Sequence, residues 1–413
     1  MRPLNGRLTV PGDKSISHRY VLLAALARGR SRIHGLAPGQ DVRSTVSCLK
    51  TLGARLSFAN EHVLEAEGAI LETPDRDLDA GNSGTTMRLL AGVLAGHPFT
   101  STMTGDASLS SRPMERVASP LRQMGASVAT TNGRAPMTIT GGSLHAIAYE
   151  SPVASAQIKS AVLLAGLFAD GRTSVTEPAA TRDHTERAFA AFGLDVESRP
   201  GFAAVQGGQH LRGADLEVPG DPSSAATWAA VAASIPGSAI EIDGVALNPG
   251  RIGFVDALRR AGAEVTVDVR AETSGEPVGT IRVAYGAPAF FEVAPAEVAS
   301  LIDELPVLAA MAARRGGMRV TGASELRVKE SDRIRQIVAG LRAFGAEADE
   351  LPDGFAIGAS PLGSADVDAH HDHRLAMAFA IAGLGSVRTR IAGAEVVNVS
   401  YPGFLDLLAA RTT

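Results

Sequence analysis

The stretch Leu121-Arg-Gln-Met-Gly125-Ala126, an apolar helix end followed by a glycine and a small residue, indicates the fold because the chain repeats it. Four further copies have the same form: Leu49-Lys-Thr-Leu-Gly53-Ala54, Phe189-Ala-Ala-Phe-Gly193-Leu194, Leu258-Arg-Arg-Ala-Gly262-Ala263 and Leu341-Arg-Ala-Phe-Gly345-Ala346. The five glycines are 72, 68, 69 and 83 residues apart, and one sixth of the 413 residues is about 69. We therefore predict six repeats, the last ending the chain with a truncated helix at residues 404–410.

A second helix, rich in Ala and Leu, recurs in the same phase. Its predicted copies are Ser15 to Ala27, Gly84 to Ala95, Ser155 to Ala169, Ser223 to Ser234, Leu301 to Arg314 and His373 to Ala382. Each is expected to end near a glycine with a left-handed backbone, at Gly29, Gly96, Gly171, Gly237, Gly316 and Gly385. Runs typical of strands follow, such as Arg172 to Thr176, so each repeat reads as βαβαββ and the fold class as α+β.

The repeats also predict how the chain divides into domains. Six small repeats cannot share one core at this length, so we divide them three and three, with the boundary near residue 225. The helix from Ser223 to Ser234 holds almost only small and apolar residues, which predicts burial on all sides. The segment from Glu272 to Gly279 is predicted to be an exposed loop.

Composition excludes several classes of protein. With 45% hydrophobic and 20% charged residues the chain can form real cores, so it is not disordered. No apolar stretch approaches the ~20 residues of a membrane span, and the first residues lack the order of a secretory signal. The single cysteine, Cys48, excludes an internal disulfide and a multi-thiolate metal site. We therefore expect a cytoplasmic protein that does not bind membranes.

Charge limits the partners in a similar way. A net charge of −5 and only 4% aromatic residues argue against nucleic acid as a partner. An anionic ligand would have to be held by local positive charge.

The starts of the Ala- and Leu-rich helices hold most of the polar residues in otherwise apolar surroundings. These starts are Gly12-Asp-Lys14-Ser15, Gly81-Asn82-Ser-Gly84, Ser155-Ala156-Gln157, Asp221-Pro-Ser-Ser224, Asp303-Glu304 and Asp372-His373-Arg374. A helix N-terminus presents unpaired N–H groups and attracts anions. Ser, Thr, Asn and Asp at such positions could equally be ordinary N-caps.

Capping does not explain the basic residues nearby, which are Lys14, Arg19, Arg88, Arg112, Lys159, Arg182, Lys329, Arg333 and Arg374. A solvated surface position is the alternative for each of them. However, Arg88 and Lys159 lie in apolar helices, where a buried cation needs an anionic partner. We predict that a ligand with several negative charges supplies it.

Two carboxylates lie among these cations. Asp303 opens an apolar helix, and Glu330 follows Lys329. A carboxylate near cations stays ionised and can serve as a base, whereas one in a drier place can act as an acid. The alternatives are an N-cap for Asp303 and a surface position for Glu330.

Other catalytic motifs fail on inspection. Gly12-Asp-Lys14-Ser15 is not a Walker A loop, because position 13 is Asp instead of Gly. The run from His370 to His373 has no partner ligands, so we expect no metal. Cys48 falls on an amphipathic helix and is not expected to act as a nucleophile.

Six motifs resemble those of the 5-enolpyruvylshikimate-3-phosphate synthases, which are 3-phosphoshikimate 1-carboxyvinyltransferases. They are Pro11 to Arg19, Gly81 to Arg88, Gly105 to Met114, Ser155 to Ser160, Arg327 to Arg333 and Asp372 to Arg374, so the resemblance runs essentially end to end. It implies two domains of three βαβαββ units each, with an active site in the interdomain cleft. Because the chain starts and finishes in one domain in this family, domain I is expected at residues 1–11 and 226–413, and domain II at residues 12–225.

The resemblance also implies the reaction. The family transfers the enolpyruvyl group of phosphoenolpyruvate to the 5-hydroxyl of shikimate 3-phosphate in chorismate and aromatic amino-acid biosynthesis. Addition gives a tetrahedral phospho-ketal, and elimination releases phosphate, without metal or organic cofactor. We expect the chain to act as a monomer on these small anionic substrates, with closure of the two domains around both anions as a hypothesis.

Site residues follow from the resemblance position by position. Shikimate 3-phosphate would be held by Lys14, Ser15, Arg19, Ser155, Ala156, Gln157, Thr181, Arg182, Asp303 and Lys329. Phosphoenolpyruvate would contact Lys14, Asn82, Gly84, Arg112, Gln157, Arg333 and Arg374. Asp303 would be the base for the 5-hydroxyl and Glu330 the group that handles the C3 proton. Lys14, Lys329 and His373 would assist electrostatically or in proton transfer.

One position departs from the family pattern, and three other functions compete. Many members carry a lysine shortly before an aromatic-Pro pair near the C-terminus, where this chain has Val399. The competing readings are a UDP-N-acetylglucosamine enolpyruvyl transferase, an RNA 3′-phosphate cyclase and a non-catalytic anion-binding protein. The first normally has a reactive cysteine, which residues 102–117 lack, and an Asn where Ser15 follows Lys14.

Overall fold

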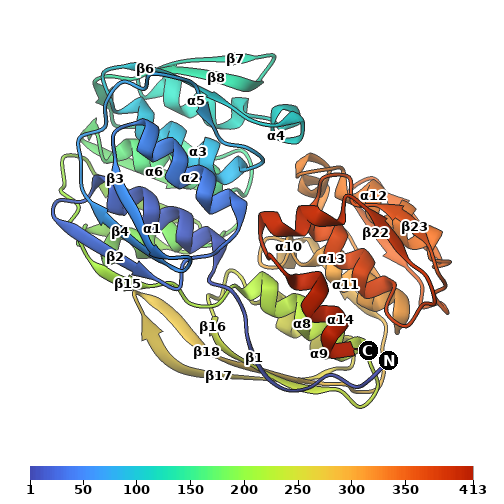
Figure 1. Ribbon diagram of the computed structural model, residues 1–413. Helices are drawn as coiled ribbons and strands as arrows, with labels where there is room; N and C mark the ends of the chain where they lie inside the picture. The colour runs from blue at the N-terminus through green and yellow to red at the C-terminus, as the bar shows by residue number, and fades with distance from the viewer. Residues whose placement is uncertain (413) are drawn as a thin grey trace. The chain divides into compact units, whose positions relative to one another are not determined.

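The computed structural model describes residues 1–412 and divides into two compact units (Figure 1). Unit 1 contains Met1–Pro11, Pro219–Ala271 and residues 277–412, and unit 2 contains Gly12–Val218 and Glu272–Glu276. The chain returns to unit 1 after Val218, before the predicted boundary near residue 225. Helix α8 (Pro222–Ser234) therefore belongs wholly to unit 1.

Within residues 1–412, five four-stranded sheets share one design. An edge strand runs parallel to the second strand, and the second strand runs antiparallel to the nearer strand of a hairpin. In unit 2 the sheets are β15-β2-β4-β3 (Asp215–Glu217, Arg30–His34, Val63–Glu67, Arg55–Asn60), β5-β6-β8-β7 (Leu78–Asp79, Thr100–Thr104, Arg134–Thr140, Ser127–Thr131) and β10-β12-β14-β13 (Ala148–Glu150, Arg172–Thr176, Phe202–Gln206, Val196–Arg199). A short parallel pair, β9 (Leu144–His145) and β11 (Ala169–Asp170), adds to them.

Unit 1 uses the same design. Its four-stranded sheets are β1-β16-β18-β17 (Asn5–Thr9, Ala239–Ala246, Glu276–Ala284, Glu264–Thr273) and β19-β20-β22-β21 (Phe291–Val293, Met318–Val320, Gly354–Ile357, Ala348–Leu351). The parallel pair β23 (Asp366–Asp368) and β24 (Arg390–Ala392) has only the first two strands of the design. The predicted α+β class is confirmed.

Two of the repeats take their edge strand from a distant part of the chain. Strand β1 precedes helix α1 (Lys14–Leu26) in sequence, yet it pairs with β16, from Asn5 opposite Ala239 to Thr9 opposite Asp243. The sheet that follows α1 is completed instead by β15. The predicted repeats are therefore not six continuous segments, which is why residues 1–11 lie in unit 1.

The Ala- and Leu-rich helices have nearly the predicted bounds. In unit 2 they are α1, α3 (Gly84–Ala95) and α6 (Ala156–Gly166), and in unit 1 they are α8, α11 (Leu305–Arg314) and α13 (His373–Ala382). Helix α11 begins at Leu305 instead of Leu301, because residues 301–304 form turns before the helix, whose first positions include Pro306. The α6 helix stops before the predicted Ala169, which instead starts β11.

Each unit also contains further helices. In unit 2 they are α2 (Gln40–Thr51), α4 (Ala107–Ser111), α5 (Glu115–Gln123) and α7 (His184–Ala191). In unit 1 they are α9 (Gly253–Arg260), α10 (Pro295–Val298), α12 (Arg333–Ala343), α14 (Phe404–Thr412) and the 3-10 turns η1 (Ser324–Val328) and η2 (Ala394–Val399). Helix α14 is the predicted last copy, and the ends of the chain meet where the Arg2 N–H donates to the Thr412 carbonyl at 2.9 Å.

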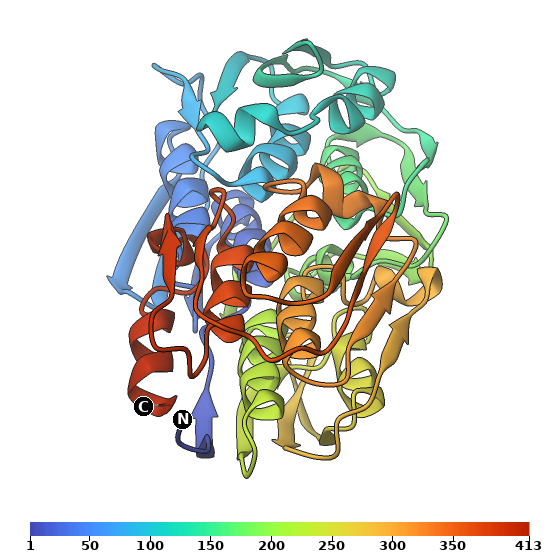
Figure 2. The same ribbon diagram turned by 90° about the vertical axis from the view of Figure 1, so that its right-hand side faces the viewer.

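Each unit is built around three of these Ala- and Leu-rich helices. In unit 1, α8, α11 and α13 contact one another (Figure 2), and all thirteen residues of α8 are buried, as predicted. In unit 2, α3 lies against both α1 and α6. Gly92 permits the approach to α6, since a Cβ there would lie 2.2 Å from the Ala161 carbonyl oxygen.

Two local predictions are wrong. Residues 272–279 are not an exposed loop but the tip of the β17-β18 hairpin, where Ser274 and Gly275 have φ values of 51° and 82°. Positive φ at both central residues is the hairpin turn that matches strand twist. Glu276 at this tip is 1% exposed and pairs with His184, and both residues belong to unit 2. Gly96 has φ −88°, so it is not left-handed like the other five predicted helix-ending glycines.

Candidate active site

Lys14 is the first residue of α1. The helix is capped by Asp13, whose carboxylate accepts from the Ile16 N–H at 2.7 Å. The Lys14 ammonium lies 2.8 Å from Asp41 Oδ2, in the first turn of α2. Asp41 was not predicted from the sequence, although an acidic residue at a helix start was a signal for it.

Arg19 is a buried cation, with 3% of its surface exposed. Its guanidinium donates to the Thr185 and Ser160 hydroxyls at 2.7 Å each and to the Ser15 carbonyl at 2.9 Å. Burial, with the charge of Arg182, lowers the pKa of Arg19 to about 10. Within residues 1–412 no carboxylate lies at ion-pair distance from it, so an anionic ligand would stabilise its charge.

The start of α3 brings Asn82, Gly84 and Arg112 together. Arg112 Nη2 donates to Asn82 Oδ1 at 2.6 Å, and Asn82 Nδ2 donates to Asp106 at 2.7 Å. Gly84 lies beside two cations, since a Cβ added to it would lie 3.1 Å from Arg88 Nη1 and 3.3 Å from Arg112 Nη1. The helix N-terminus and both guanidinium groups therefore present positive charge at one place.

Arg88, which the sequence predicts to pair with a negatively charged ligand, reaches from α3 to α6. Its Nη1 donates to Gln157 Oε1 at 2.5 Å, while Gln157 Nε2 donates to Thr85 Oγ1 at 3.0 Å. Gln157 is thus oriented by both of its amide atoms. Beside it, Ser155 is the N-cap of α6 and makes no side-chain capping bond, so Ala156 begins a helix whose first N–H groups are not capped by that side chain.

The structure corrects the prediction for Lys159. Its ammonium lies 2.9 Å from Glu177 and 2.9 Å from Glu186, so two glutamates, and not a ligand, compensate this buried cation. Burial by itself would lower the pKa of Lys159, but the two carboxylates outweigh burial and raise it. The Arg182 guanidinium lies near the start of α1, with its Nη1 3.4 Å from Ser15 Oγ.

In unit 1, Asp303 lies next to two cations. Lys329 Nζ is 3.2 Å and Arg333 Nη1 is 3.5 Å from Asp303 Oδ1. The Asp303 side chain is 17% exposed, and Lys329 is 28% exposed, so both can be reached by a ligand. Asp303 is not the N-cap of α11, because Glu304 holds that position.

Arg333, the first residue of α12, forms ion pairs with the carboxylates of Asp303, Glu330 and Asp372. Nε and Nη2 donate to Asp372 at 2.7 and 3.1 Å, and Nη2 donates to Glu330 at 2.6 Å. Its side chain is 1% exposed, and although burial lowers the pKa of a guanidinium, Asp372 and Glu330 raise that of Arg333. Most of its donors are therefore committed to the protein, which leaves little for the predicted contact with phosphoenolpyruvate.

Helix α13 starts beside this cluster with His373 and Arg374, which are 3% and 7% exposed. Asp372 caps the helix by accepting from the Arg374 N–H at 2.9 Å. No carboxylate of residues 1–412 lies at ion-pair distance from the Arg374 guanidinium, which is thus a second buried cation suited to an anion. Close by, burial raises the pKa of Glu304, whose carboxylate accepts from the Ser223 hydroxyl.

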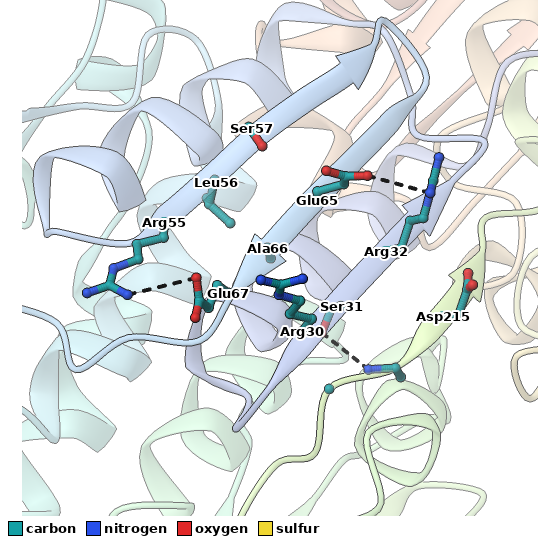
Figure 3. A pocket seen from close by; sticks show the side chains of 12 residues that line it. Arg30, Ser31, Arg32, Arg55, Leu56, Ser57, Glu65, Ala66, Glu67 and Asp215 are labelled. Carbon is teal, nitrogen blue, oxygen red and sulfur yellow. Dashed lines mark hydrogen bonds and ion pairs between the residues drawn. The ribbon is translucent and has the colours of Figure 1, made fainter.

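A hollow of about 760 Å³ lies over the sheet β15-β2-β4-β3 (Figure 3). None of the predicted site residues lines it. Four of its exposed charged side chains are paired across strands, Arg32 with Glu65 and Arg55 with Glu67. Such exposed pairs contribute little energy, so nothing in this hollow indicates a built site.

Two further features are absent from residues 1–412. No group of three or more His, Cys, Asp and Glu side chains is placed to hold a metal ion. No helix combines the length and the apolar character that crossing a bilayer requires. Cys48 of α2 is buried, and burial, with the nearby Asp79, raises the pKa of its thiol to about 12, which fits the prediction that it is not a nucleophile.

Comparison with known proteins shows the family. The sequence profile of EPSP synthase (3-phosphoshikimate 1-carboxyvinyltransferase) matches residues 1–408. The chain belongs to the EPSP synthase family. It is 51% identical over 412 residues to the 3-phosphoshikimate 1-carboxyvinyltransferase of Xanthomonas campestris pv. campestris, covering 98% of this chain and 94% of the relative. The enzyme of the same name from Xanthomonas euvesicatoria pv. vesicatoria is 49% identical over 413 residues, with the same coverage.

Solved structures agree. An EPSP synthase structure from Acinetobacter baumannii is 42% identical and superposes with a TM-score of 0.86, covering 99% of this chain and 96% of that one. The predicted family and enzyme class are therefore confirmed. This EPSP synthase family member transfers the enolpyruvyl group of phosphoenolpyruvate to shikimate 3-phosphate in aromatic biosynthesis. The matches above lend no support to the UDP-N-acetylglucosamine, RNA cyclase or non-catalytic readings.

Proposed function

We propose that unit 2 supplies most of the contacts that hold the two anionic substrates, and that unit 1 supplies the proton transfers. The observation that carries the first part is Arg19, a buried cation whose partners are hydroxyl groups and a carbonyl instead of carboxylates. A phosphate or carboxylate group of a substrate would complete its pairing. Lys14, Arg112, Arg182 and the starts of α1, α3 and α6 would add donors.

Asp303 is proposed as the base in the addition step. Lys329 and Arg333 favour its ionised form, in which it can accept the proton of the 5-hydroxyl. The hydroxyl oxygen then bonds to C2 of phosphoenolpyruvate, and the electron pair of the C2–C3 double bond takes up, at C3, the proton of the Glu330 carboxyl group, which becomes a carboxylate. The product of this step is the tetrahedral phospho-ketal with a methyl group.

Glu330 is proposed as the group that handles the C3 proton. In the elimination step the bond from C2 to the phosphate oxygen breaks, a methyl proton leaves, and the double bond forms again. Arg333 favours the ionised form of Glu330 at 2.6 Å, which suits removal of that proton. Lys14, Lys329, His373 and Arg374 would stabilise the negative charge of the departing phosphate.

The direct test is to mix the protein with both substrates and follow phosphate release, with each substrate alone as the control. Release that needs both substrates supports the proposal. No release from folded protein would contradict it.

We also propose that the enzyme is a cytoplasmic monomer. The single cysteine, which has no possible disulfide partner in the chain, suits a reducing compartment. Light scattering across a range of concentrations would test the oligomeric state, and a mass of twice 42.6 kDa would overturn the monomer.

A further inference from the structure

One short loop of unit 2 carries two of the proposed substrate-binding residues. It spans residues 178–183, between β12 and α7, and contains Thr181 and Arg182, both half-buried. A connection without regular structure loses entropy when it adopts one conformation, so specific contacts must fix it. Two of the residues that make these contacts, Glu177 and Lys159, have no role in the proposed reaction.

Glu177, at the start of this loop, is held on two sides. Its side chain is 0% exposed, and its Oε2 lies 2.9 Å from the Lys159 ammonium. Its N–H donates to the Gly201 carbonyl at 2.8 Å, which continues the strand pairing of β12 and β14. Lys159 also lies 2.9 Å from Glu186, in the first turn of α7. The Lys159 ammonium on α6 therefore pairs with one residue on each side of the loop and restrains both ends.

From Glu177 the contact continues into the loop itself. The Thr181 hydroxyl donates to Glu177 Oε1 at 2.6 Å. The two oxygens of the carboxylate thus have different partners, with Oε2 facing Lys159 and Oε1 facing Thr181. A hydrogen bond to a charged, buried acceptor is among the stronger ones in proteins. Beyond Thr181, Arg182 reaches Ser15 at the start of α1.

We propose that Glu177, itself held by Lys159, is a positioning residue that fixes the loop of residues 178–183 for substrate binding. This inference rests on the proposed function, because it takes this loop to meet shikimate 3-phosphate. The Thr181 hydroxyl then donates its proton to Glu177 and not to the substrate. Lys159 and Glu177 act on the reaction only through the residues that they hold.

Hydrogen exchange of the unliganded protein tests the positioning directly. Thr181→Val removes the hydroxyl, and we expect the amide protons of residues 179–183 to exchange roughly tenfold faster. Thr181→Ser keeps the hydroxyl and should restore the wild-type rate. Thr100→Val is the matched control, because its hydroxyl pairs with Thr140 on a strand that carries no proposed site residue. Unchanged exchange in Thr181→Val would overturn the proposal.

Kinetics then separate positioning from direct contact. Thr181→Val should raise the KM for shikimate 3-phosphate roughly tenfold and leave kcat nearly unchanged. Glu177→Gln cannot face both Lys159 and Thr181 with an acceptor, so it should raise the same KM. In the double variant, the KM for shikimate 3-phosphate should be no higher than in the single variant with the higher KM. Both substitutions break the same contact between Glu177 and Thr181, so their effects should not add.

Additive effects would show that Thr181 contacts the substrate independently, and would overturn the proposal. A KM defect that Thr181→Ser fails to restore would do the same. If Glu177→Gln does not fold, the exchange rates of Thr181→Val and Thr181→Ser still decide. If the wild-type protein releases no phosphate, the proposed function fails, while the exchange experiment continues to judge the positioning of the loop.

Discussion

Arg333 Nη2 lies 2.6 Å from Glu330 Oε2, and the same guanidinium is 3.5 Å from Asp303. One buried cation thus connects the two carboxylates proposed for proton transfer. Because Asp372 occupies two more of its N–H groups, Arg333 cannot turn toward a ligand without breaking these bonds. We therefore interpret Arg333 first as the residue that orders Asp303 and Glu330.

Arg333→Lys tests this interpretation through stability. A lysine has no planar fork, so it cannot donate to Asp372 and Glu330 together, and it leaves buried carboxylates poorly paired. We expect a loss of about 3 kcal/mol in the free energy of unfolding, measured in urea. The control is Arg342→Lys on the same helix, whose exposed pair with Asp349 should be worth less than about 1 kcal/mol. Equal losses in the two variants would contradict the interpretation.

Asp303→Asn tests the proposed base. The amide keeps the shape of the side chain but cannot accept the 5-hydroxyl proton, so kcat should fall by about 10² or more. Binding of shikimate 3-phosphate, measured by calorimetry, should change far less than kcat. Asp256→Asn, at an exposed site on α9, serves as the control and should leave phosphate release unchanged. Near-normal turnover by Asp303→Asn would rule out its role as the base.

Two glycines of α3 should respond differently to the same substitution. In Gly84→Ala the new methyl group meets the ends of two flexible side chains, Arg88 and Arg112, at 3.1 and 3.3 Å. These can shift by a few tenths of an ångström, so the fold should survive while the KM for phosphoenolpyruvate rises several-fold. In Gly92→Ala the methyl group meets backbone at 2.2 Å, so thermal stability should fall instead. A stability loss in Gly84→Ala with an unchanged KM would argue against Arg88 and Arg112 as part of the site.

The repeated phrases in the sequence predicted the helices well because each repeat carries its own local signals. The bounds of α3 and α13 agree with the prediction at both ends of each helix. Ser83 caps the N-terminus of α3, and Asp372 caps that of α13. The exchange of β1 and β15 between repeats left no such signal. Strand pairing over more than 180 residues depends on the path of the chain in space, which the residues of a five-residue strand do not encode.

The same limit applies to the site. Lys159 in an apolar helix predicted a negatively charged partner, and the partner exists, but it is Glu177 and Glu186 instead of a ligand. Sequence position could not distinguish the two, because both glutamates come from other elements. The tip of the β17-β18 hairpin was missed for a different reason. Its Ser274-Gly275 turn is visible in the sequence, but the polar residues around it are typical of an exposed loop.

His18 gives a prediction about acid stability. It lies in α1 with no exposed surface, and its Nδ1 is 2.7 Å from Thr45 Oγ1. Burial first, then the charges of Lys14 and Arg19, lower the pKa of His18 well below 6.5. The folded protein therefore keeps this imidazole neutral at pH values where the unfolded chain binds a proton. As pH falls below 6.5, this difference should cost about 1.4 kcal/mol per pH unit until the folded pKa is reached.

His18→Asn should remove that dependence, because an amide can still contact Thr45 but does not titrate. Urea unfolding of both proteins between about pH 8 and pH 5 measures the effect. The wild type should lose stability relative to the variant only on the acid side of 6.5, whatever the difference between them at pH 8. Parallel curves across the whole range would mean that the buried imidazole does not resist protonation, and that Lys14 and Arg19 do not act on it as the structure indicates.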